Sequence, residues 1–108
     1  MTTVNVVMLI GNLATDVELR EVGEGKHRAT FLLAVDRPRG DSADFVGVVT
    51  WDKQAEACAE QLAKGRRIAL DGRLRSRTWE EGGKRRTAIE VVAHHLEFLS
   101  ATAGAAVA

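Results

Sequence analysis

The chain has 108 residues, of which 28% are charged and 45% hydrophobic, so it is long enough for one folded domain with a core but too short for two. Its 15 Lys and Arg residues balance its 15 Asp and Glu residues, and the single Cys58 excludes an internal disulfide. The sequence shows neither a secretory signal at its start nor an apolar run of membrane-spanning length, and it therefore predicts a cytoplasmic protein with no membrane partner.

Charge is distributed unevenly along the chain. Residues 1–60 hold six basic and ten acidic residues, whereas residues 61–108 hold nine basic and five acidic ones. A surface that binds a polyanion is therefore expected mainly in the second half.

The first strand is expected over residues 4–10, which are rich in β-branched residues and end at Gly11. Both faces of this strand are apolar. One face is predicted to line the core, while the other, carrying Val7 and Leu9, is predicted to meet a second layer or another subunit. After a bend at Gly11 the strand is predicted to continue over residues 13–20.

A turn at residues 23–25 then leads into a second predicted strand over about residues 26–35. The polar segment 36–44, which contains the only proline, Pro38, predicts a loop. A third strand is expected over residues 45–51, so all three of these strands precede any helix.

The third strand has apolar residues on both faces. Because side chains alternate along a strand, Phe45 shares a face with Trp51, whereas Val46 and Val48 share the opposite face. Packing in a core is one interpretation of the two aromatic residues, and exposure to a ligand is the other. From the residues alone, both interpretations stay open.

One helix is predicted over residues 53–64. Asp52 is expected to cap its start, because a carboxylate accepts hydrogen bonds from the free N–H groups of the first turn, and Gly65 is expected to end it in a left-handed conformation. Cys58 falls on the apolar side of this helix and is interpreted as a core residue rather than a nucleophile.

After the helix, apolar and outward-facing side chains alternate over residues 68–75, which predicts a strand with one side turned inward. Residues 80–84 contain two glycines and predict a hairpin tip, and a last strand is expected over residues 86–99. Residues 100–108 are small and nearly uncharged and are predicted to form a short disordered tail.

The order of three strands, one helix and two strands predicts an all-β fold. It suits the OB-fold, a five-stranded Greek-key barrel, with one short helix between strands 3 and 4 and a single domain over residues 1–99. A small split α+β sheet has the same order of elements and remains an alternative.

Exposed aromatic residues are the first sign of a surface for unpaired bases, because a ring stacked on a base contributes about 1–3 kcal/mol without reading its identity. Trp79 is surrounded by charged and polar neighbours beside the Gly82-Gly83 tip, a poor setting for burial. We predict an exposed functional role for Trp79, as a surface on which unpaired bases stack, and Phe45 and Trp51 are the two other stacking candidates.

Basic residues at every second position of the strand after the helix share one face and form a cationic row about 14 Å long. A charge run is usually a solvated face, but the position of this row next to Trp79 favours contact with nucleic-acid phosphates. The row consists of Arg73, Arg75 and Arg77; the hairpin tip adds Lys84, Arg85 and Arg86, and the loop around Pro38 adds Arg37 and Arg39.

The sequence predicts no metal, cofactor or enzymatic activity. His94 and His95 are neighbours in a strand and are expected to point to opposite faces, and no second cysteine completes a zinc site. The chain also lacks a Gly-rich phosphate loop and a Ser/His/Asp arrangement.

Three segments together resemble the bacterial single-stranded DNA-binding protein family, in order over about residues 4–99. They are residues 5–13 (NVVMLIGNL), 62–65 (LAKG) and 70–79 (LDGRLRSRTW). The resemblance implies an OB-fold, a homotetramer, a location with the nucleoid in the cytoplasm, and protection of single-stranded DNA during replication, recombination or repair.

The resemblance also implies roles for particular residues. Phe45, Trp51 and Trp79 match positions where the family places stacking aromatic residues, so Phe45 and Trp51 would face DNA while Val46 and Val48 face the core. Basic positions that the family uses for the DNA backbone are matched, or nearly so, by Arg20, Lys53, Arg73, Arg75 and Arg77.

Two departures from the family pattern bear on function. A further stacking Trp, common in the loop after the second strand, is replaced by Pro38 between Arg37 and Arg39, which implies weaker binding. The family's long linker and acidic, Phe-terminated peptide do not follow before the sequence stops at Ala108, which implies either a tail-less paralogue or a truncated form. In both cases recruitment of replication or repair enzymes through such a tail is not expected.

An alternative function is an OB-fold adaptor that acts mainly through protein–protein contacts in replication restart. The neutral net charge and the missing loop aromatic favour that alternative. An enzyme is a third and more distant hypothesis, since no acid–base or metal set is present.

Overall fold

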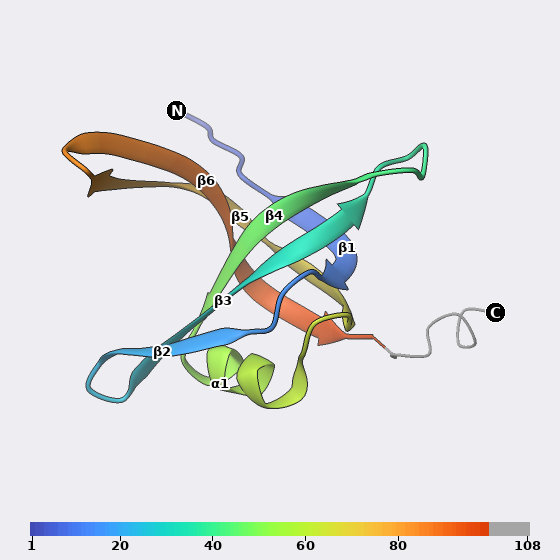
Figure 1. The fold of residues 1–108 in the computed structure, drawn as a ribbon, viewed down its shortest axis with the longest axis horizontal. Coiled ribbons are helices and arrows are strands. Elements are labelled where there is room, and N and C mark those ends of the chain that lie inside the picture. The colour runs from blue at the N-terminus through green and yellow to red at the C-terminus, as the bar shows by residue number, and fades with distance from the viewer. Residues whose placement is uncertain (100–108) are drawn as a thin grey trace.

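The computed structural model describes residues 1–99, and the tail predicted over residues 100–108 lies outside the described residues. Six strands and one helix follow one another along the chain (Figure 1). They are β1 (Val7–Leu13), β2 (Glu18–Gly23), β3 (Lys26–Asp36), β4 (Ala43–Trp51), α1 (Asp52–Gln61), β5 (Arg67–Glu81) and β6 (Lys84–Phe98).

The strands form one sheet that closes on itself. They lie in the order β1-β5-β6-β4-β3-β2, and β1 also pairs with β3, which joins the first strand of this order to the fifth. All pairings are antiparallel except that of β4 with β6. The structure therefore has the predicted all-β OB-fold, with its helix between β4 and β5.

The predicted first strand with its continuation is two separate strands. β1 pairs with β5 from Val7 to Asn12 and then with β3 at Asn12 and Leu13, after which residues 14–17 leave the sheet. β2 begins at Glu18 and pairs with the first half of β3, from Lys26 to Thr30. At the predicted bend, β1 changes its pairing partner from β5 to β3 and then ends. The structure therefore has six strands where five were predicted.

The two faces of β1 are the reverse of the prediction. Val7 and Leu9 are partly buried and pack against the core, not against a second layer or subunit. The exposed apolar side chains are at the alternate positions: Met8 and Ile10 in β1, and Val4 and Val6 in the residues just before it. Both parities of this segment are apolar, so the sequence pattern could not tell which one the barrel buries.

The core lies inside the barrel and draws on every strand except β2. Val48 of β4 is buried in it and Val46 packs against it, as predicted for that face. Cys58 of α1 is fully buried, and burial raises the pKa of its thiol to about 11, so it remains a neutral core residue near neutral pH. Thr50 is fully buried, and its hydroxyl oxygen accepts a hydrogen bond from Gln54 Nε2 in the first turn of α1.

Both predicted ends of the helix are wrong. Trp51, not Asp52, occupies the position before the first turn and its side chain makes no capping hydrogen bond, while Asp52 is inside the helix with a positive φ of 55°. The helix ends at Gln61, because Leu62 turns to an extended conformation and becomes buried. Gly65 does have a left-handed φ, but it lies in a turn after the helix. Its N–H donates to the carbonyl of Leu13 at 2.8 Å.

In the described part of the chain, residues 75–90 of the β5–β6 hairpin pair only with each other, because the pairing of β5 with β1 ends at Gly72 and the pairing of β6 with β4 starts at Val91. We call residues 75–90 the arm. Figure 1 shows that the arm and the β2–β3 hairpin both project from the same side of the barrel, one above the other.

A bulge lies at the base of the arm, where Asp71 pairs with His95 and Gly72 pairs with Ala93. His94 is therefore the extra residue, and both His94 and His95 are exposed. No helix of residues 1–99 is long and apolar enough to cross a membrane.

Gly72 is required by this bulge, and a substitution tests it. A Cβ at Gly72 would collide with the backbone carbonyl of Val92, whereas a Cβ at Gly47 would meet nothing within 4 Å. We predict that Gly72→Ala lowers the free energy of unfolding by about 1–3 kcal/mol through overpacking. Gly47→Ala should instead raise it by about 0.5–1 kcal/mol. Urea denaturation measures both, and equal stability of the two variants would contradict the packing at the bulge.

Candidate nucleic-acid interface

A groove with a volume of about 610 Å³ crosses the outer face of β3 and β4. Thr30 and Leu32 of β3 and Gly47 and Val49 of β4 line its floor. The segment from β1 into β2 borders one side, and the arm borders the other. Because Gly47 has no side chain and nothing else occupies that space, the floor is flat and open at its centre.

Charged side chains of both signs line the groove. Its basic residues are Arg20, Arg28, Arg75 and Arg77, and its acidic residues are Asp16, Glu18 and Glu90. Three of these arginines are among the predicted phosphate-binding residues. Arg28 and Glu90 are not, although both lie on the groove side of their strands.

Phe45 and Trp51 lie on the same face of β4, near its two ends. The side chain of Phe45 is 64% exposed although it is large and apolar, whereas Trp51 is half-buried. Six residues along a strand separate them by about 20 Å. The open floor at Gly47 and the buried Val49 lie between them on that face.

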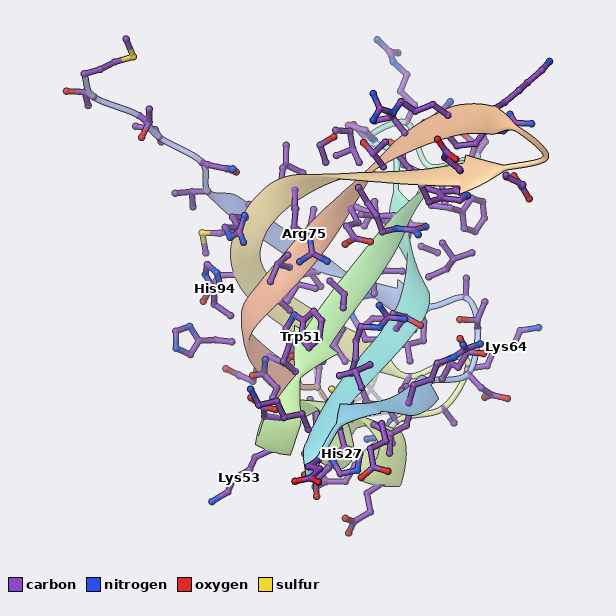
Figure 2. All side chains as sticks on the ribbon, turned by 90° about the vertical axis from the view of Figure 1, so that its left-hand side faces the viewer. His27, Trp51, Lys53, Lys64, Arg75 and His94 are labelled. Atoms are coloured by element: carbon purple, nitrogen blue, oxygen red, sulfur yellow. The ribbon has the colours of Figure 1, made fainter. Side chains whose placement is uncertain are left out.

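Trp51 lies between two arginines. The guanidinium of Arg28, directly opposite on β3, is 6.0 Å from the ring centre, and that of Arg75 on β5 is 5.9 Å away. Figure 2 shows Arg75 above Trp51 on the face turned to the viewer. These cation–π contacts hold the indole in place and give it a positively charged surrounding.

Trp79 is less open than predicted, because its ring carries the guanidinium of Arg77 at 4.2 Å from the ring centre. The two residues are on the same side of the arm, two positions apart in β5. Trp79 is therefore half-buried, and the pair forms a short stack of two flat groups.

Arg75 and Arg77 share one carboxylate, that of Glu90. Arg75 Nε donates to Glu90 Oε2 at 3.0 Å and Arg75 Nη2 donates to the same oxygen, while Arg77 Nε is 3.4 Å from Oε1. The Glu90 side chain is only 15% exposed. Sequence reasoning missed this residue, because its position opposite Arg75 depends on the register between β5 and β6.

Other predicted phosphate-binding residues form looser pairs at the surface. Arg20 is 3.4 Å from Glu18, Arg37 is 2.9 Å from Asp44 and Arg86 is 3.6 Å from Glu81, and each of these side chains is more than half exposed. Such pairs are weak and screened by salt, so a phosphate can replace the carboxylate. Among residues 1–99, no carboxylate pairs with Arg39, Lys53, Arg73, Lys84 or Arg85.

The ten predicted phosphate-binding residues do not form one cluster. Arg20, Arg75 and Arg77 line the groove. Lys53 lies at the start of α1 and points away from the barrel in Figure 2. The others lie outside the groove lining: Arg73 near the base of the arm, Lys84, Arg85 and Arg86 at its tip, and Arg37 and Arg39 in the loop after β3.

Arg28, Thr30 and Leu32 could have been found from the sequence. They alternate with Ala29, Phe31 and Leu33, which are all buried, so their side chains must lie on the outer face of β3. The residues 1–99 contain no group of three or more His, Cys, Asp or Glu side chains that could hold a metal ion. His95 Nδ1 instead lies 3.0 Å from Asp71 Oδ1.

Comparison with known proteins gives consistent matches. Residues 4–99 match the model of the single-strand binding protein family. Single-stranded DNA-binding proteins of Clostridium tetani, Treponema pallidum and Bacillus cereus are 45%, 33% and 43% identical to the chain over 88%, 98% and 88% of its length. The matched regions cover 70%, 64% and 59% of those three proteins.

The stack of Arg77 on Trp79 makes a prediction for the free protein. In a Trp51→Phe background, Arg77→Ala should increase the quenching of Trp79 fluorescence by acrylamide, because the guanidinium no longer covers the ring. The free energy of unfolding should fall by no more than about 0.5–1 kcal/mol. Arg85→Ala in the same background is the control. Equal quenching in both variants would contradict the stack.

Proposed function

Because the chain belongs to the single-strand binding protein family, it binds single-stranded DNA, and we propose that it does so along the groove on β3 and β4. The observation that carries this proposal is Phe45, a large apolar side chain that is 64% exposed on the same strand face as the arginine-flanked Trp51. An exposed ring costs hydration free energy unless a ligand covers it, and unpaired bases offer flat apolar faces that fit it.

Bases stack on the aromatic residues of the face in this proposal. One base lies on Phe45 and another on the open edge of Trp51, and the flat floor at Gly47 leaves room for the chain of bases between them. The Arg77–Trp79 stack offers a third platform on the arm. A guanidinium plane stacks on bases as an aromatic ring does, so Arg77 extends the platform that Trp79 begins.

Phosphates meet the basic residues around this face. In the proposal they contact Arg20, Arg37, Arg39, Lys53, Arg73, Arg75, Arg77, Lys84, Arg85 and Arg86, and Arg28 joins them. Stacking and phosphate contacts do not read the edges of bases, so binding has little sequence preference. The protein coats and protects single strands during replication, recombination or repair, at the nucleoid in the cytoplasm, and performs no chemistry on them.

An exposed apolar row, formed by Met8 and Ile10 of β1 and by Val4 and Val6 just before it, supports a homo-oligomer. Between Val7 and Gly11, β1 pairs within residues 1–99 with β5 on one edge only. Among the described residues, its other edge has no strand partner and can pair with a strand of a second copy. A second copy that covers the row removes both its apolar surface and its open edge from water. We infer a homotetramer, as the resemblance to the family implies.

A titration of Trp fluorescence with oligo-dT tests the proposed function and its site. The parent should show a saturable change in emission at low salt. Phe45→Ala should weaken binding by about 1–3 kcal/mol, because one stacking contact is lost. Ile89→Ala is the control, since Ile89 is 61% exposed but pairs with Ser76, on the opposite face of the arm from Arg75. No change of emission or of anisotropy with the parent at micromolar DNA would contradict the function, and equal weakening by both variants would contradict the site.

The oligomer makes a separate prediction. Met8→Glu introduces a charge into the exposed row of β1, and burying that charge against a second copy is unfavourable. The mass measured by light scattering should therefore fall from that of the oligomer toward that of a monomer. Val22→Glu on β2, where the apolar side chain is also exposed, should leave the mass unchanged. A parent that already has the mass of a monomer would remove the proposal.

A further inference from the structure

Glu90 differs from the other acidic residues that pair with predicted phosphate-binding arginines. Glu18, Asp44 and Glu81 are each more than 60% exposed, and each contacts one arginine at the surface. Glu90 is 15% exposed and contacts two arginines of the groove, Arg75 and Arg77. We call these three residues the Glu90 cluster.

The geometry of the cluster keeps the carboxylate in place. Glu90 on β6 is directly opposite Arg75 on β5, and two nitrogen atoms of Arg75 donate to it. Arg75 also lies over Trp51 and is itself only 32% exposed. A carboxylate fixed in this way cannot swing away or be replaced by solvent ions as the exposed ones can.

Each arginine of the cluster is held between Glu90 and an aromatic ring. Arg75 reaches from Glu90 to Trp51, and Arg77 reaches from Glu90 to Trp79. Two guanidinium groups with one fixed carboxylate carry a net charge of about +1 at neutral pH. A phosphate that approaches the cluster therefore meets the field of one cation instead of two.

We propose that Glu90 acts as a built-in counter-ion that limits how strongly the groove holds DNA and how steeply that binding depends on salt. This inference rests on the proposed function. A strand that binds near an arginine releases counter-ions in proportion to the charge that it neutralises. Because Glu90 already neutralises one of the two guanidinium groups, the cluster contributes one phosphate contact to the salt dependence, not two.

The experiment measures the dissociation constant of oligo-dT at several salt concentrations by fluorescence anisotropy. The change Glu90→Gln keeps a hydrogen-bond acceptor of the same size and removes the negative charge. It should steepen the slope of log binding constant against log salt concentration by about 0.7. The ratio of its binding constant to that of the parent should therefore grow about five-fold for each ten-fold dilution of salt. Arg77→Gln should flatten the slope by about 0.7. The double variant with both changes should have the slope of the parent.

Glu97→Gln is the matched control. Glu97 is an exposed residue of the same strand that lies outside the groove lining, and its substitution changes the net charge of the chain by the same amount. Its slope should equal that of the parent. A slope as steep as that of Glu90→Gln would show that overall charge is responsible and would overturn the inference.

Two other outcomes overturn it as well. One is a Glu90→Gln slope that equals the parent's or is flatter, which would mean that Glu90 only positions the arginines for DNA. The other applies if thermal melting shows that Glu90→Gln alone does not fold. Arg77→Gln is then compared with the double variant, and equal slopes for those two variants would overturn the inference. A parent that binds no oligo-dT would contradict the proposed function itself.

Discussion

Gly11 lies where β1 leaves its pairing with β5 and begins to pair with β3. A Cβ at this position would meet the backbone carbonyl of Ala34 and the side chain of Leu33, so the two strands approach each other as closely as their backbones allow. This approach closes the sheet into a barrel, since β3 is otherwise joined to β1 only through β4, β6 and β5. With the barrel closed, the barrel parts of β1, β3, β4, β5 and β6 have one face toward a filled core and one face toward solvent.

The candidate interface follows from that division into two faces. Alternate residues of β3 and β4 fill the core, so their neighbours must line the outer surface, where no helix of the described chain covers them. The arm and the β2–β3 hairpin extend past the barrel on this side and turn a flat sheet face into a groove. The groove residues of β3 and β4 are therefore held by strands whose other side is packed, which fixes their spacing.

Local patterns in the sequence were sufficient where alternation or composition decides the structure. The opposite faces of Phe45 and Val46, the row of arginines that leads to Trp79 and the core position of Cys58 all follow from periodicity. The errors come from interactions between distant segments. The buried parity of β1 depends on which strands flank it, the helix ends early because Leu62 packs into the core, and Glu90 meets Arg75 only through the register of two strands.

In the proposed site, aromatic stacking lets a chain of zero net charge hold a polyanion although part of its positive charge is already paired. Binding that relied on net charge would need an excess of basic residues, which this sequence lacks. Here the arginines of the groove are placed against Trp51, Trp79 and Glu90, so much of their charge is already engaged before DNA arrives. The contribution of aromatic stacking does not depend on salt as phosphate contacts do. A groove whose arginines are already paired, next to several flat groups, should therefore lose less affinity at high salt than its number of arginines suggests.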